Sequence, residues 1–137
     1  MVEKRTKSRE ISTQIITITY KYNGDNIAEQ VVSSDFEEDG MKGSYTVKTT
    51  FDKYDTKSYN PYYKSFEGGA ITSSKNLPLE TTSVSSMIIK DYPPFTFTVK
   101  CEYSYTLEKN YPTEIRTFIL DDDGESEEYT TFIEYKK

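Results

Sequence analysis

An aromatic segment carries the most distinctive chemistry in this chain of 137 residues. The regular alternation of the sequence stops between residues 54 and 78, where bends are predicted at Asn60-Pro61 and Gly68-Gly69. A tyrosine ring stacks on apolar surfaces while its hydroxyl forms hydrogen bonds, a combination that is enriched at binding surfaces. The candidate binding residues are Tyr54, Tyr59, Asn60, Tyr62, Tyr63 and Phe66.

The same segment also has a structural interpretation. Loops without regular structure that exceed about 12 to 15 residues are uncommon in compact domains unless they are functional or disordered. A tyrosine-rich segment that lay back across a half-open sheet would cover the apolar face and the edges of that sheet. We expect a mixture of the two roles, with Phe66 buried as an anchor and at least one of Tyr59, Tyr62 and Tyr63 exposed.

Most catalytic chemistry is excluded by composition. The chain has no histidine, which removes Ser-His and Cys-His nucleophilic mechanisms and most catalytic zinc sites. No glycine-rich phosphate loop occurs, so we expect no nucleotide cofactor. A pair of carboxylates, as in glycosidases, is the remaining route. The acidic residues that fall on predicted strands lie on polar faces or in turns, so we expect no enzyme, with a carboxylate-based glycosidase as an alternative.

An acidic turn at Asp121-Asp122-Asp123-Gly124 invites comparison with calcium loops. If Gly124 were the sixth residue of an EF-hand loop, the first position would be Ile119 and the twelfth Thr130, and neither is a carboxylate. The sequence therefore predicts an Asp-Gly hairpin turn and no metal site.

The elements that position these residues are predicted to be β-strands. Aromatic residues make up 15% of the chain, with 13 tyrosines, and such residues favour a pleated, half-buried surface. The clearest pattern runs from Phe97 to Leu107, where apolar residues alternate strictly with polar ones. Residues 108–112 interrupt this pattern and Ile115 resumes it, which predicts a hairpin.

Further extended segments are predicted at residues 11–22, 27–34, 45–51, 79–90 and 129–135. The predicted fold is all-β, an antiparallel meander of about seven strands that forms a strongly curved sheet or a partly closed barrel, because both edges of an open sheet would be exposed. Residues 11–137 are predicted to form a single β domain, and residues 1–10 a flexible N-terminal arm.

A short motif recurs along the chain. KNLPLE at residues 75–80 matches KNYPTE at residues 109–114 almost position for position, which suggests a meander of similar hairpins. Together with the segments KYDTKSYNPYY and EYSYTLEKNYPTEIRTF, the motif resembles uncharacterised Bacteroidetes envelope proteins, often lipoproteins, with a β-domain described as porin-like. It is also distantly similar to the Tyr-Asp repeats of Rhs-type proteins. The resemblance implies a curved antiparallel sheet or barrel in a cell envelope, and it assigns no catalytic or ligand residues.

Charge and hydropathy narrow the range of partners. The net charge is -6, which argues against nucleic acids and anionic membrane surfaces. No apolar run is long enough for a membrane-spanning helix, and the first residues lack the apolar region of a signal peptide. Cys101 is the only cysteine, so we expect no internal disulfide and a buried, inert thiol.

The sequence favours a non-enzymatic binding or structural module of a bacterial cell envelope, with an unknown protein or glycan partner. The alternative is a carrier of a small apolar ligand inside a barrel, as in lipocalins. The bulk of the inward-facing residues distinguishes the two, because Phe97, Tyr103, Tyr105 and Leu107 would fill a small barrel.

Overall fold

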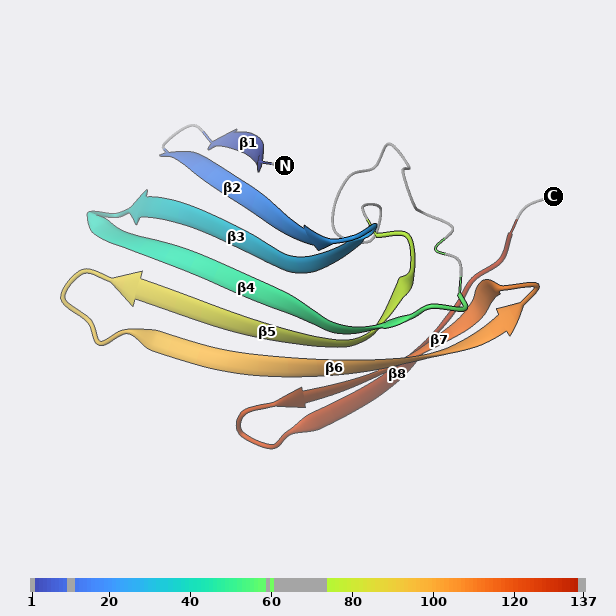
Figure 1. Cartoon of the computed structure of the whole chain (residues 1–137). Coiled ribbons are helices and arrows are strands. Elements are labelled where there is room, and N and C mark those ends of the chain that lie inside the picture. Colours follow the sequence, from blue (N-terminus) through green and yellow to red (C-terminus); the bar gives the residue numbers. More distant parts are fainter. Residues whose placement is uncertain (1, 10–11, 59, 61–73, 136–137) are drawn as a thin grey trace.

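A single antiparallel sheet contains every strand of the computed structural model, which describes residues 2–9, 12–58, 60 and 74–135 (Figure 1). The strands lie side by side in sequence order, and each pairs only with its neighbours in the chain. They are β1 (Val2–Arg9), β2 (Ser12–Asn23), β3 (Asn26–Glu38), β4 (Met41–Asp55), β5 (Leu77–Ile89), β6 (Phe95–Glu108), β7 (Tyr111–Asp121) and β8 (Ser126–Phe132). The predicted all-β antiparallel meander is confirmed.

The first strand was not expected from the sequence. Residues 2–9, predicted to lie in a flexible arm, form β1 and pair with β2 from Val2 opposite Thr19 to Arg9 opposite Ser12. This segment is highly charged and lacks apolar alternation, so the pattern of its sequence does not reveal it. Its backbone nevertheless completes the outer ladder of β2, and the sheet has eight strands.

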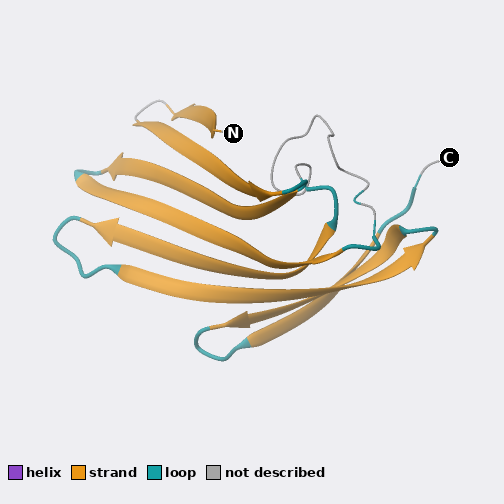
Figure 2. Cartoon of the chain, in the orientation of Figure 1, coloured by secondary structure: helices purple, strands orange, loops and turns teal. Residues whose placement is uncertain are grey.

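The sheet is open (Figure 2). Within the described residues β1 pairs only with β2 and β8 only with β7, so these strands do not close into a barrel. The part of the chain that the structure describes also contains no helix with the length and hydrophobicity of a transmembrane span.

Alternation along the strands gives the sheet one mainly apolar face. The register of β6 and β7 sets Cys101 opposite Ile119 and Tyr105 opposite Ile115, as expected for the predicted hairpin, and the ladders extend this face to the other strands. Cys101 is only partly buried. The apolar face consists of Ile16, Ile18, Tyr20, Val32, Tyr45, Val47, Phe51, Met87, Phe95, Phe97, Val99, Cys101, Tyr103, Tyr105, Ile115 and Ile119.

The core is small and lies at one end of the sheet. Among the described residues only three hydrophobic side chains are buried, Tyr20, Ile27 and Leu77. All three lie where β2 ends and where β3 and β5 begin. We call this the junction end, and its opposite, which carries the β3–β4 and β5–β6 turns, the hairpin end.

Three tyrosines close hairpins at the junction end. Each hydroxyl donates to a backbone carbonyl of the second residue of the preceding strand: Tyr54 to Ile27 in β3, Tyr105 to Pro78 in β5, and Tyr135 to Pro112 in β7. The strand that supplies the carbonyl first pairs with the strand that follows it at Glu29, Glu80 or Glu114. In every case the accepting residue lies two positions before that glutamate. We call these the tyrosine clips, and each uses a carbonyl that lies beyond the ladder of the hairpin that it closes.

The clips give the repeated sequence motif a structural meaning. Pro78 and Pro112 occupy the same position in KNLPLE and KNYPTE, and both carbonyls accept a tyrosine hydroxyl. Asn26-Ile27-Ala28-Glu29 is the corresponding segment of β3, with isoleucine in place of proline. The β2–β3 and β6–β7 ladders also share a register shift close to the turn.

Candidate functional site

Two of the predicted binding residues, Tyr54 and Asn60, lie together at the base of the β4–β5 connection. Tyr54 is near the end of β4, and Asn60 follows it before the connection returns at Ser74. The other four, Tyr59, Tyr62, Tyr63 and Phe66, lie outside the described residues. The expected burial of Phe66 and exposure of a neighbouring tyrosine therefore stay predictions.

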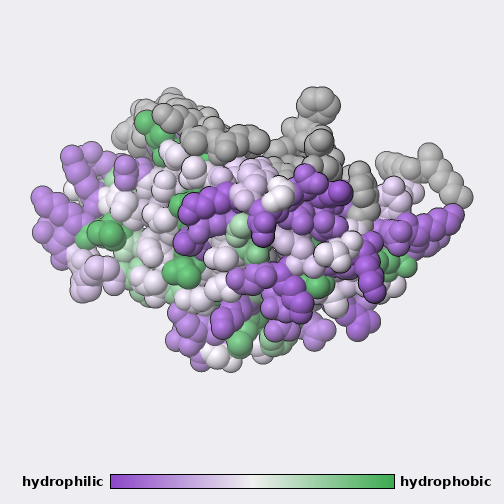
Figure 3. Space-filling view, viewed as in Figure 1, coloured by the Kyte–Doolittle hydropathy of each residue, from purple (hydrophilic) through white to green (hydrophobic). Residues whose placement is uncertain are grey.

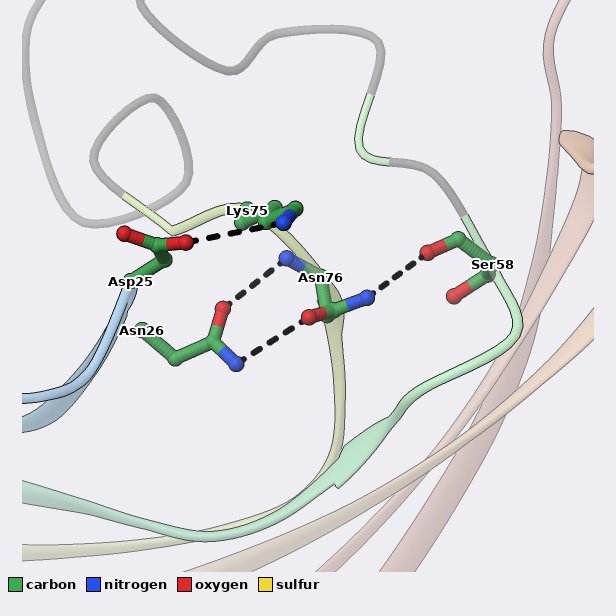
Figure 4. Close-up of polar contacts among 5 residues, drawn as sticks. All are labelled: Asp25, Asn26, Ser58, Lys75 and Asn76. Carbon is green, nitrogen blue, oxygen red and sulfur yellow. Dashed lines mark hydrogen bonds and ion pairs between the residues drawn. The ribbon is translucent and has the colours of Figure 1, made fainter.

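The described part of the site is a network of polar side chains that brings three chain segments together (Figure 4). We call it the polar junction. It joins the β2–β3 turn, the end of β4 with the residues that follow it, and the residues just before β5. Its members are Asp25, Asn26, Tyr54, Ser58, Asn60, Ser74, Lys75 and Asn76.

A closed ring of hydrogen bonds surrounds the backbone of Ile27, which is fully buried at 0% exposure. The amide of Ile27 donates to Ser74 Oγ at 3.0 Å, and Tyr54 Oη donates to the carbonyl of Ile27 at 2.7 Å. Because the single hydroxyl proton of Tyr54 is used in that bond, the 3.0 Å contact between Ser74 and Tyr54 has Ser74 as its donor. Two side chains thus satisfy both backbone polar groups of a buried residue that lies beyond the β3–β4 ladder.

Asparagine side chains fix the two ends of the β4–β5 connection. Asn60 Nδ2 donates to the carbonyl of Ser74 at 2.7 Å, and Asn60 is only 1% exposed. Asn76 Oδ1 accepts a hydrogen bond from Asn26 Nδ2 at 3.2 Å, and the backbone amide of Asn76 donates to Asn26 Oδ1 at 2.9 Å. Asn76 Nδ2 donates to the carbonyl of Ser58 at 3.1 Å. Figure 4 shows Asn76 between Asn26 and Ser58. The segment from 58 to 76 therefore leaves and re-enters the sheet at one point.

Tyr54 and Asn60 both form hydrogen bonds within the polar junction. Burial raises the pKa of the Tyr54 hydroxyl despite the opposing bond from Ser74. The Tyr54 ring also stacks on Phe51, with 6.1 Å between ring centroids. A binding role for these two side chains stays a prediction.

Sequence reasoning missed most of the polar junction. Ser74, Asn76 and Asn26 are short polar residues of the kind common in turns, and nothing in their local spacing shows that they meet. The one available indication is the repeated asparagine ahead of a strand, seen at Asn26, Asn76 and Asn110.

A second candidate site is the part of the apolar face that lies at the hairpin end. We call this part of the face the aromatic end. Phe95 is 62% exposed and its ring lies 6.3 Å from that of Phe97. Met87 pairs with Phe95 across the β5–β6 ladder, and Tyr45 pairs with Met87 in turn. Tyr92, in the adjoining turn, is 66% exposed. On the apolar face Tyr20 is therefore buried at the junction end, whereas Phe95 is exposed at the aromatic end.

The opposite face of the sheet carries paired charges. Glu29 lies 2.7 Å from both Lys21 Nζ and Lys48 Nζ, and hydrogen bonds from these two ammonium groups lower the pKa of its carboxyl group. Glu80 pairs with Lys53 at 3.2 Å. The carboxylates of Glu29 and Glu80 thus have lysine partners, and Glu80 also lies directly opposite Glu102 across the β5–β6 ladder. No cluster of three or more potential metal ligands occurs within the residues that the structure describes.

The acidic segment at Asp121 to Gly124 forms the β7–β8 turn. Asp121 accepts the Gly124 amide at its carbonyl and the Glu125 amide at its carboxylate. Asp122 Oδ2 accepts the Thr98 amide of β6 at 2.8 Å. Gly124 has a φ of 82°, which glycine adopts without strain. The predicted Asp-Gly turn is confirmed, and two of its carboxylates are occupied by backbone amides.

Shallow hollows indent the surface of the described residues. One, of about 550 Å³, lies at the hairpin end between Phe36, Lys42 and Ile88, and another, of about 630 Å³, lies beside Tyr111 and Tyr135. Both mix charged and apolar residues. Figure 3 shows the same mixture over the side of the molecule in view, where hydrophobic residues are scattered among hydrophilic ones.

Comparison with known proteins places the chain in no family: no family model, curated protein or solved structure matched it.

Proposed function

We propose that this chain is a non-enzymatic binding module that takes up a protein or glycan partner through the aromatic end of its apolar face. The observation that carries the proposal is the uneven cover of this face. Tyr20 of this face is buried at the junction end, where Ile27 and Leu77 are also buried, whereas Phe95 is 62% exposed at the aromatic end. Exposed aromatic rings supply the stacking and desolvation that dominate binding at interfaces.

The charge distribution supports a role without catalysis. The carboxylates of Glu29 and Glu80, on the opposite face, form ion pairs with lysines. A glycosidase needs one carboxyl group with a raised pKa beside a second that stays ionised, and lysine partners act in the other direction on Glu29.

An apolar surface that is accessible from outside favours a binding module over a carrier of lipocalin type. Such a carrier encloses its ligand in a closed sheet, whereas the described strands leave both edges of the sheet unpaired. The strong curvature of the sheet that the sequence predicts belongs to the same proposal. The proposed location in a bacterial cell envelope is supported by the resemblance of the repeated sequence motifs alone.

The test uses the apolar dye 1-anilinonaphthalene-8-sulfonate as a probe of the aromatic end. We expect saturable dye binding by the native protein and its loss in the double variant Phe95→Thr/Phe97→Thr, because threonine keeps strand propensity but removes the rings. The matched control is Phe118→Thr, which removes a partly exposed ring on the other face, opposite Glu102. Cooperative thermal unfolding of each variant shows that the dye reports a surface and not a loosened fold.

The same variants then separate partner classes. A peptide library and a glycan array are probed with the native protein, the double variant and the Phe118→Thr control. A partner that the double variant binds as tightly as the native protein would contradict the proposal, as would a native protein that does not bind the dye.

A further inference from the structure

The two outer strands of the sheet carry opposite charge. Strand β1, Val2–Arg9, has four basic residues and one acidic residue, whereas β8, Ser126–Phe132, has two acidic residues and no basic one. The turn that precedes β8 adds Asp122, Asp123 and Glu125. Within the described residues each of these strands is paired on one side only.

Unpaired strand edges present a row of amide and carbonyl groups that readily join another strand. Charged residues on an edge usually prevent this, because two copies of the same edge repel each other. Pairing of β1 with β1 of another copy would bring together four basic residues from each copy. Pairing of β8 with β8 would bring together two glutamates from each copy and the acidic turns that precede them. The pairing of β1 with β8 is the one that opposite charge favours.

The direction of the strands suits this pairing. In a meander of eight antiparallel strands, β8 runs opposite to β1. A second copy in the same orientation can therefore place its β1 beside β8 of the first copy and continue the antiparallel sheet. The two strands also match in length, at eight and seven residues.

The eight residues of β1 can overlap all seven of β8 in two registers, and one of these also sets Arg9 opposite Glu125 of the acidic turn. With Val2 of one copy opposite Phe132 of the other, antiparallel pairing sets Lys7 opposite Glu127 and Arg9 opposite Glu125. Opposite charges that face each other across a ladder stabilise it, whereas like charges destabilise it.

We propose that this chain associates head to tail with a second copy of itself, β1 of one copy pairing with β8 of the next. The contact is heterologous, so it forms a ring or an open filament instead of a symmetric dimer. It uses the edges of the sheet and leaves the aromatic end free, so its test is independent of the dye experiment.

Sedimentation velocity over a range of protein concentrations tests the proposal. We expect species larger than the monomer at low ionic strength, and weaker association at about 0.5 M NaCl because salt screens exposed charges. The variant Lys7→Glu/Arg9→Glu should weaken association by roughly tenfold or more, and Glu125→Lys/Glu127→Lys should do the same. The control Lys90→Glu/Lys100→Glu, which makes the same change in net charge as Lys7→Glu/Arg9→Glu but away from both edges, should leave association unchanged.

Charge exchange makes the test specific to the two edges. The variant that combines all four edge substitutions restores complementary charge and should associate like the native protein. An equimolar mixture of the two edge variants should associate although each alone does not. Circular dichroism checks that every variant retains its sheet. A native protein that stays monomeric at all concentrations, as it would if β1 and β8 closed within one chain, would overturn the proposal. Association that ignores the edge substitutions would overturn it equally.

Discussion

Individual tyrosine hydroxyls hold this sheet together at its junction end. Tyr54, Tyr105 and Tyr135 each donate to a carbonyl that lies beyond the ladder of its hairpin. A sheet with so little buried hydrophobic surface depends on such bonds more than a layered domain does, because burial of apolar area normally supplies most of the stability. The three clips add hydrogen bonds at the positions where the ladder of each hairpin has ended.

Removal of one clip should cost measurable stability. Tyr105→Phe deletes the hydroxyl that binds the carbonyl of Pro78 and keeps the ring. We expect the free energy of unfolding to fall by about 1 to 2 kcal/mol, because a partly buried carbonyl loses its partner. The control is Tyr92→Phe in the exposed β5–β6 turn, for which we expect a change below about 0.5 kcal/mol. Urea denaturation measures both, and equal stability of the two variants would show that the clip contributes nothing.

At the scale of the strand, Gly43 in β4 marks a point of close approach. It lies between Phe36 of β3 and Ile89 of β5 in the ladders. A Cβ atom at this position would contact the Phe36 ring and would lie 2.7 Å from the carbonyl oxygen of Ile88. The ring can move, but the carbonyl belongs to the backbone of a central strand. A side chain at position 43 would therefore displace β5.

Gly43→Ala should accordingly destabilise the fold by about 1 to 3 kcal/mol, the usual cost of overpacking. We expect Phe36→Leu to relieve only part of this cost when it is combined with Gly43→Ala, because the contact with the Ile88 carbonyl persists. Ser44→Ala in the same strand is the matched control. Thermal unfolding gives the comparison, and full recovery in the double variant would mean that the ring alone requires glycine.

At the scale of the whole molecule, the free energy of unfolding should decrease as the pH becomes alkaline. Burial raises the pKa of Tyr54, Tyr103 and Tyr105 above the ordinary value in the folded protein. Below a pH of about 10 both the folded and the unfolded chain hold these protons, and the contribution of the tyrosines to stability is complete. Above it the unfolded chain loses them first, so the free energy of unfolding falls as pH rises toward the folded pKa values.

Melting temperatures from about pH 8 to pH 11.5, followed by circular dichroism, measure this dependence. Absorbance of tyrosinate recorded in the same samples should rise with unfolding. Tyr105→Phe should show a shallower decline because one of the perturbed groups is gone. A melting temperature that stays flat across this range would contradict the assignment of these hydroxyls to buried, hydrogen-bonded positions.

The sequence by itself determined most of the strands and several of their turns. Alternation over Phe97 to Leu107 is a local property with a period of two, so it predicts a strand and its faces without knowledge of neighbours. The Asp-Gly turn before β8 and the hairpin of β6 and β7 followed from the same local rules. The repeated proline motif indicated similar hairpins, and the clips at Pro78 and Pro112 show what that similarity consists of.

Only the tertiary structure decided the role of the candidate site and the state of the edges. Tyr54 and Asn60 belong to the polar junction because Ser74 lies 20 and 14 residues further along the chain, and the pairing of β4 with β5 brings it back. No local pattern encodes that meeting. Strand β1 likewise forms by pairing with the outer side of β2. Its charged sequence has no alternating apolar face from which a strand could be predicted. The opposite charges of β1 and β8 were visible in the sequence, but their position on the two edges of one open sheet is a property of the folded chain.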